Sequence, residues 1–162
     1  MALPRVPNEE IAAAFTSFVR DTGPRLKEAL IAALGGEAGR EATSEALTWA
    51  WEHWTLVETM ANPAGYLYRL GRNRGLTSFR KRRVVGSGSE VSSDEHLVEP
   101  GLASALARLS EIQRTAVLLI HGFGWTYREV AAHLGIAVGS VQTHVDRAMT
   151  KLRRDLKVEI NA

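Results

Sequence analysis

Three residues toward the C-terminal end of the chain have the spacing of a helix-turn-helix, in which two helices cross at a tight turn. Ala131 supplies the small side chain at the crossing, Gly135 tolerates the positive φ of the turn, and Val141 faces back into the core. The other apolar side chains of this core are Val130, Leu134, Ile136 and Val145. The spacing predicts that roughly residues 126–153 bind duplex DNA. The alternative is a helical hairpin that only packs.

The outward face of the second helix of this motif is polar and basic. With Val141 and Val145 pointing inward, the side chains between them face outward or lie on the flanks. Because the first turns of a recognition helix reach base edges, the candidates for reading bases are Gln142, Thr143 and His144, beside Ser140. The candidates for contacts to phosphates are Arg128 on the first helix and Arg147, Lys151, Arg153 and Arg154 on the second.

A second candidate surface for nucleic acid lies in residues 63–83, which contain basic residues and no acidic one. The basic residues are Arg69, Arg72, Arg74, Arg80, Lys81, Arg82 and Arg83. Residues 36–62 are instead rich in glutamate, and residues 84–100 hold acids without a base, so the net charge of +2 conceals a strong segregation. A basic block of this kind suits a polyanion. The alternative is that these basic residues only form the solvated end of a helix.

The elements that position these residues are predicted to be helices, because apolar residues recur at intervals of three and four along most of the chain. We expect a first helix up to Gly23-Pro24, which interrupts it, and a second that closes at Gly35-Gly36. A third runs from about residue 37 to 54 and places Trp51 and Trp54 in the core, with Trp49 more exposed. After a loop at 55–62, Asn62-Pro63 starts a fourth helix that extends to about residue 83.

The composition changes at residues 84–100, where glycine, serine and acidic residues predict a linker. A short helix follows, marked by Leu102, Leu106 and Leu109. Two capping boxes, Ser110 with Gln113 and Thr126 with Glu129, each predict the start of a helix. The last helix is expected over about residues 139–157.

Several classes of function find no support in the residues. The absence of cysteine excludes a disulfide framework, a thiol nucleophile and thiolate zinc sites. The chain also has no phosphate-binding loop and no His-Glu-x-x-His pattern, so no catalytic residue, cofactor, metal or small-molecule substrate is expected. Residues 1–10 lack the apolar core of a signal peptide, and no apolar run approaches about 20 residues, which predicts a cytoplasmic protein without a membrane partner. We interpret the remaining histidines, His53, His96, His121 and His133, as ordinary surface residues.

Two sets of motifs lie in opposite halves of the chain. The N-terminal set is Gly23-Pro24-Arg25-Leu26, Ala50-Trp51, Tyr66-Leu67-Tyr68-Arg69-Leu70-Gly71-Arg72-Asn73 and Arg80 to Arg83. The C-terminal set is Ala107-Arg108-Leu109-Ser110, Trp125-Thr126-Tyr127-Arg128-Glu129-Val130-Ala131 and Gly139-Ser140-Val141-Gln142-Thr143-His144. In this order, the two sets resemble regions 2 and 4 of bacterial sigma factors, and the chain length resembles the small extracytoplasmic-function (ECF) group.

The resemblance implies an all-α protein of two small helical domains joined by a flexible linker. The region 2-like domain would span residues 8–83, the acidic linker 84–100, and the region 4-like helix-turn-helix domain 101–160. Region 2 would dock on the bacterial RNA polymerase core and help to open the downstream promoter element. Region 4 would hold the upstream element as duplex. Promoter DNA, the polymerase core and an anti-sigma protein are thus the implied partners.

Individual residues take roles from the same resemblance. Glu41, Glu45 and Trp49 would contact the polymerase, and residues 55–62 would capture a flipped base. The residues that would grip phosphates beside the opening are Arg69, Arg72, Asn73, Arg74 and Arg80. The chain departs from the family pattern at Glu41-Ala42-Thr43-Ser44-Glu45 and at Ala137, where a capping serine or threonine is usual. There are therefore two alternatives. One is a DNA-binding regulator that works without polymerase, and the other is a sigma-like adaptor that does not support initiation.

Overall fold

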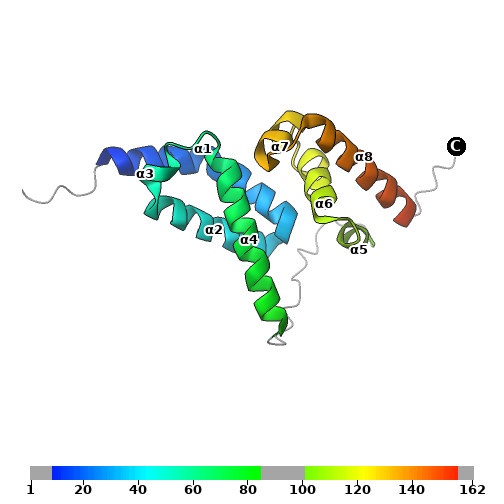
Figure 1. Cartoon of the computed structure of the whole chain (residues 1–162). Coiled ribbons are helices and arrows are strands. Elements are labelled where there is room, and N and C mark those ends of the chain that lie inside the picture. Colours follow the sequence, from blue (N-terminus) through cyan, green and yellow to red (C-terminus); the bar gives the residue numbers. More distant parts are fainter. Residues whose placement is uncertain (1–8, 85–100, 157–162) are drawn as a thin grey trace, which may run out of the picture.

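The computed structural model describes residues 9–84 and 101–156, with side chains given up to residue 78 and again from residue 101. Its regular elements are α1 (Glu9–Leu34), α2 (Gly36–Glu52), α3 (Trp54–Val57), α4 (Pro63–Val84), α5 (Leu102–Ala107), α6 (Glu111–Val117), the π-helical turn η1 (Leu118–Gly122), α7 (Tyr127–Leu134) and α8 (Val138–Asp155). Every regular element in these ranges is a helix, which confirms the all-α class. Helices α1–α4 form one body and α5–α8 a second (Figure 1). The predicted linker lies mainly at 85–100, outside the described residues.

Helix α1 runs through Pro24 without a break, so the predicted interruption at Gly23-Pro24 is wrong. Proline inside a helix removes one backbone hydrogen bond, which costs about 3 kcal/mol or more. Packing on both sides of Pro24 offsets this cost. Before it, the Phe18 ring lies 5.3 Å from that of Trp54, and after it Leu26 and Leu30 are fully buried.

Helix α2 lies against α1 and α4 through a face of small residues, Ala42, Ala46 and Ala50, all of which are buried. The approach to α1 is closest at Gly39, where a Cβ atom would lie 2.5 Å from the Ile31 backbone, so only glycine fits. Trp54 is buried as predicted. The prediction for Trp51 is wrong: it lies at the surface, 43% exposed, with its ring centroid 5.0 Å from that of Phe15.

The start of α4 confirms the predicted cap. The side-chain oxygen of Asn62 accepts a hydrogen bond from the Gly65 backbone at 3.0 Å, and Pro63 occupies the first helical position. The predicted loop at 55–62 contains one helical turn, α3, whose Val57 is fully buried. This turn fixes the loop to the core of the first body.

The second body follows its local signals closely. Both capping boxes are present, Ser110 with Gln113 before α6 and Thr126 with Glu129 before α7. Gly135 ends α7 at φ 69°, the left-handed conformation that the turn requires. Ala137 precedes α8 and provides no side-chain cap.

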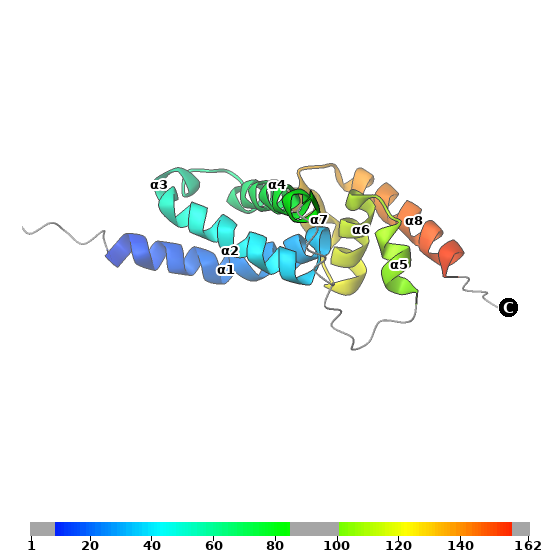
Figure 2. The ribbon, with the colours of Figure 1, turned by 90° about the horizontal axis from the view of Figure 1, so that it is seen from below.

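The two bodies pack against each other (Figure 2). Helix α1 contacts α6 and η1, and α4 contacts α7. Buried residues from both bodies form one continuous hydrophobic cluster, which includes Leu30 and Leu67 from the first and Trp125 and Val130 from the second. We call this contact the junction.

Candidate nucleic-acid interface

The helix-turn-helix is formed by α7 and α8 around the side chains that the sequence singles out. Val141 and Val145 are buried to 0% and 2% exposure on the inner face of α8, and Ala131 is buried on α7. Thr126 accepts a hydrogen bond from the Glu129 backbone at 3.1 Å, and the Glu129 carboxylate accepts one from the Thr126 backbone at 2.7 Å. The orientation of α8 is therefore set by its apolar face and by the capped turn of α7.

The polar side chains at the start of α8 face solvent. Ser140, Gln142 and Thr143 are exposed, and the helix packs its other face on α5, α6 and α7 (Figure 1). The Thr143 hydroxyl donates to the Gly139 carbonyl at 3.0 Å. His144 lies on the flank: it is half-buried, and its Nδ1 is buried without a hydrogen-bond partner among the described residues. Exposed amides and hydroxyls in the first turns are the groups that read base edges in a major groove.

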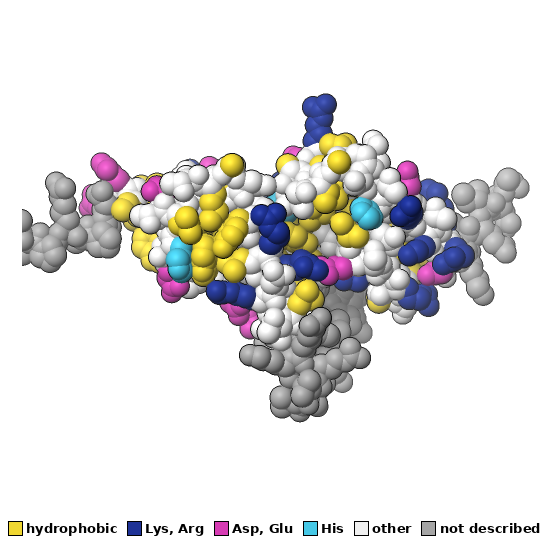
Figure 3. Space-filling view, viewed as in Figure 1, with side chains coloured by type: hydrophobic (Ala, Val, Ile, Leu, Met, Phe, Trp, Pro, Cys, Tyr) yellow, Lys and Arg dark blue, Asp and Glu magenta, His cyan; other side chains and the backbone are white. Residues whose placement is uncertain are grey.

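The basic residues proposed for phosphate contacts divide into two groups. Arg128, Arg147, Arg153 and Arg154 are exposed. Lys151 is half-buried, and its ammonium donates to the Gln113 side chain at 3.0 Å, which ties α8 to α6. Arg147 and Lys151 border one surface hollow of about 480 Å³ that Asp146 also lines. Figure 3 shows basic side chains along this second body.

The basic helix α4 lies partly in the junction, which the sequence did not indicate. Arg69, Asn73 and Arg74 are exposed, and the Arg69 guanidinium lies near the turn of the helix-turn-helix, 3.4 Å from where a Cβ of Gly135 would be. Arg72 forms a two-point ion pair with Glu111: its Nε donates to one carboxylate oxygen and its Nη2 donates to the other at 2.7 Å. This hydrogen-bonded carboxylate raises the pKa of Arg72. The Arg80 side chain lies outside the described residues.

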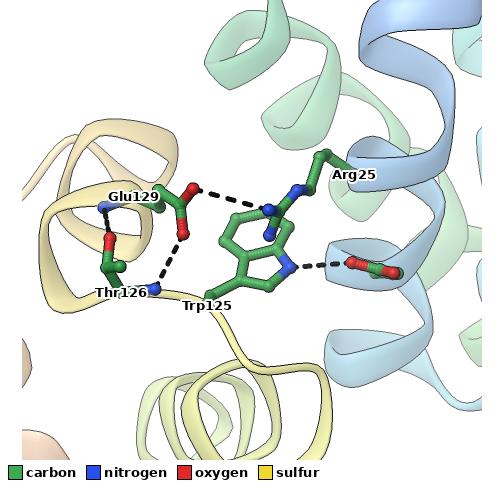
Figure 4. Close-up of polar contacts among 5 residues, drawn as sticks. Arg25, Trp125, Thr126 and Glu129 are labelled. Atoms are coloured by element: carbon green, nitrogen blue, oxygen red, sulfur yellow. Dashed lines mark hydrogen bonds and ion pairs between the residues drawn. The ribbon is translucent and has the colours of Figure 1, made fainter.

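A second set of polar contacts across the junction lies around Trp125 (Figure 4). Its indole N–H donates to Glu28 on α1 at 2.7 Å, and the Arg25 guanidinium lies 4.8 Å from the ring centroid. Arg25 also pairs with Glu129 at 3.4 Å. Hydrogen bonding to the Thr126 backbone, with the Arg25 charge as a smaller cause, lowers the pKa of Glu129. We call these residues, Arg25, Glu28, Trp125 and Glu129, the Trp125 cluster.

The interpretation of His133 as a surface residue is wrong. It is 7% exposed and lies edge-on between Tyr68 of the first body and Trp125, with ring centroids 5.1 and 5.2 Å away. Burial lowers the pKa of His133 to about 4, so the imidazole is neutral near pH 7. Burial likewise raises the pKa of Tyr68 to about 12.

The residues expected to contact polymerase follow one another along α2 at intervals of four. Glu41 is exposed, and Glu45 and Trp49 are half-buried. The Trp49 ring stacks on His53 with centroids 4.2 Å apart and lies 5.4 Å from Tyr66. Figure 3 shows a hydrophobic surface on this first body.

These features define a helical DNA-binding protein in which a helix-turn-helix body packs on a helical body that carries the basic helix α4. The family model for sigma-70 region 4 matches residues 101–152. The ECF RNA polymerase sigma factor SigL of Mycobacterium tuberculosis is 30% identical over 139 residues, covering 76% of this chain and 78% of its own length. The ECF RNA polymerase sigma factor EcfG of Rhodopseudomonas palustris is 30% identical over 138 residues, covering 78% and 76%. The chain belongs to the ECF RNA polymerase sigma factors.

Two solved structures share the fold of this chain. The sigma factor RpoE of Bartonella quintana, in complex with the anti-sigma factor NepR, is similar with a TM-score of 0.62 and 27% identity, covering 90% of this chain and 98% of that one. CnrH, in complex with the cytosolic domain of CnrY, shares the fold with a TM-score of 0.56 and 21% identity, covering 91% and 90%. Within residues 9–84 and 101–156, no helix is both long enough and apolar enough to cross a bilayer.

Proposed function

We propose that the chain binds the RNA polymerase core and directs initiation by reading the upstream promoter element as duplex with α8. The observation that carries this proposal is the division of α8 into two faces. Val141 and Val145 fix the helix to the body, and this leaves Gln142 and Thr143 at the surface. A helix so anchored can enter a major groove without moving its own core.

The remaining roles in this proposal belong to the first body. Asn73 and Arg74, exposed on α4, together with Arg69, Arg72 and Arg80, grip the phosphates beside the opened DNA. Residues 55–62, which carry the α3 turn, hold an unpaired base, and the α2 face of Glu41, Glu45 and Trp49 contacts polymerase. Unpaired bases are held by stacking worth about 1–3 kcal/mol each.

The organisation that we propose has a first unit at residues 8–83 and a second at 101–160, joined by residues 84–100. Separate units would allow the chain to reach two promoter elements at once. The complex of RpoE with the anti-sigma factor NepR supports an anti-sigma protein as a further partner. The site of action is the cytoplasm, where the polymerase and promoters are, and no chemical step is assigned to the chain.

The experiment that tests this function is run-off transcription with purified core polymerase on a library of duplex templates with randomised promoters. The proposal predicts initiation at a defined subset of templates only when the chain is added. If the chain binds DNA but transcripts remain those of core polymerase alone, it is a DNA-binding regulator or an adaptor. If the set of transcribed templates is random, α8 does not select promoters.

A further inference from the structure

The ion pair of Arg72 and Glu111 joins the two bodies at the point where α4 is proposed to meet DNA. The two donors of one guanidinium edge contact both oxygens of one carboxylate, and each side chain is about one third exposed, at 34% and 29%. The same fork of donors binds two oxygens of a phosphate equally well. Glu111 therefore occupies the place on Arg72 that a DNA phosphate would take.

The neighbouring groups on α4 show which part of the helix is covered. One turn before Arg72, Arg69 is exposed and lies against the turn at Gly135. A surface hollow of about 460 Å³ between the bodies is lined by both arginines together with Ser110, Glu111 and Leu134 among others. Asn73 and Arg74 face solvent. Among the described side chains of the proposed phosphate grip, the packed arrangement thus leaves Asn73 and Arg74 open and places Arg69 and Arg72 against the helix-turn-helix body.

The reading face of α8 is not covered in the same arrangement. Ser140, Gln142 and Thr143 are exposed, and α8 packs on helices of its own body. The packed form consequently covers part of the proposed DNA contact at α4 and leaves the proposed contact at α8 free. A bidentate pair with Glu111 and one with a phosphate exclude each other at the Nε–Nη2 edge of the Arg72 guanidinium, because each of these donors points one N–H along that edge.

We propose that Glu111 acts as an intramolecular substitute for phosphate, so that nucleic acid bound at α4 displaces it and separates the two bodies. This inference rests on the proposed phosphate grip of α4. Other contacts also hold the junction, including the Trp125 cluster, Arg114 to the Ala33 carbonyl at 3.2 Å, and Asn62 to the Ala132 carbonyl at 2.8 Å. Loss of the ion pair alone is therefore expected to shift the balance toward the open form without removing the closed one.

The separation can be followed by energy transfer in the full chain. Because the sequence has no cysteine, dyes can be attached at Ala13→Cys on α1 and Ala103→Cys on α5, both exposed positions. A short single-stranded DNA of mixed sequence is then titrated at low salt. Three variants are compared in this labelled chain: Glu111→Gln, Arg72→Gln and the control Glu10→Gln. The control makes the same change of charge at an exposed position of the first turn of α1, and Glu111→Gln keeps the side-chain shape.

The two partners of the ion pair should give opposite effects on DNA binding. Relative to Glu10→Gln, Glu111→Gln should lower the DNA concentration at half-maximal loss of transfer by about threefold or more, because the open form is more populated. Arg72→Gln should lower transfer without DNA, yet require more DNA than wild type, because the phosphate contact is lost. Equal midpoints for Glu111→Gln and Glu10→Gln would overturn the proposal while leaving the phosphate grip intact. A wild-type chain that binds no DNA would overturn the phosphate grip as well.

Discussion

The indole N–H of Trp125 donates a hydrogen bond of 2.7 Å to the carboxylate of Glu28, which joins the loop before α7 to α1 across the junction. The indole is buried, and Arg25 covers its ring from the same helix. Trp125 lies just before the helix-turn-helix and is thereby also a main contact to the first body. This relationship makes the packed form a specific state rather than two bodies in loose contact.

Removal of this hydrogen bond should weaken the junction. Trp125→Phe keeps an aromatic ring but leaves Glu28 without its donor, and hydrogen bonds to charged groups contribute about 1.5–3 kcal/mol. We expect the free energy of unfolding, measured by urea denaturation, to fall by about 2 kcal/mol. Trp51→Phe, at the 43%-exposed tryptophan, is the matched control and should change it much less. Equal losses for both variants would show that the Glu28 contact contributes nothing.

The stability of the packed form should depend on pH through His133. Its pKa is lowered by burial to about 4, below the ordinary value near 6.5, so the unfolded chain binds the extra proton between these two values. This contribution to stability is complete above pH 6.5 and is lost as the pH falls toward 4. Between pH 6 and 5, the wild type should lose about 1 kcal/mol more than His133→Leu. Identical slopes of unfolding free energy against pH would contradict the burial of a neutral imidazole.

Arg147 should contribute a phosphate contact that does not depend on sequence. Arg147→Ala is expected to weaken binding of the holoenzyme to duplex promoters uniformly and to reduce the slope of log K against log salt by about 1. Arg20→Ala, which removes an exposed arginine from α1, should leave that slope unchanged. A change in promoter preference with Arg147→Ala would instead make Arg147 a base-reading residue.

Two glycines of the helix-turn-helix should respond oppositely to alanine. Gly135 has φ 69°, where a Cβ atom is strained, so Gly135→Ala should destabilise the chain by about 1–2 kcal/mol. Gly139 lies in α8 with nothing near the position of its Cβ, so Gly139→Ala should stabilise it by up to about 1 kcal/mol. Thermal unfolding of both variants tests this. A neutral Gly135→Ala would contradict the left-handed turn.

Much of the second body could be predicted because its signals are local. A capping box involves residues three apart, as in Ser110 with Gln113, and a left-handed turn depends chiefly on one residue, Gly135. The apolar period of α8 likewise identified Val141 and Val145 as buried. These features depend on residues that are close together in the sequence, so local patterns are enough to predict them.

The features that were missed depend on residues far apart in the sequence. Pro24 stays helical because packing on both sides holds α1, and no local pattern reports that packing. His133 is buried because Tyr68, from the other body, covers it. The ion pair of Arg72 with Glu111 was hidden for the same reason: each residue alone has an ordinary local role, as a basic residue of α4 and as an acid in the first turn of α6.

Promoter selection by α8 depends most on the reading of base edges through Gln142. The direct test is to transcribe a randomised promoter library with holoenzyme that contains either the wild-type chain or Gln142→Ala, and to sequence the transcribed templates. We predict that the preference at one or two base pairs of the upstream element is lost, by about 1–3 kcal/mol each, while the downstream element is unchanged. An upstream preference identical to that of the wild type would contradict the claim.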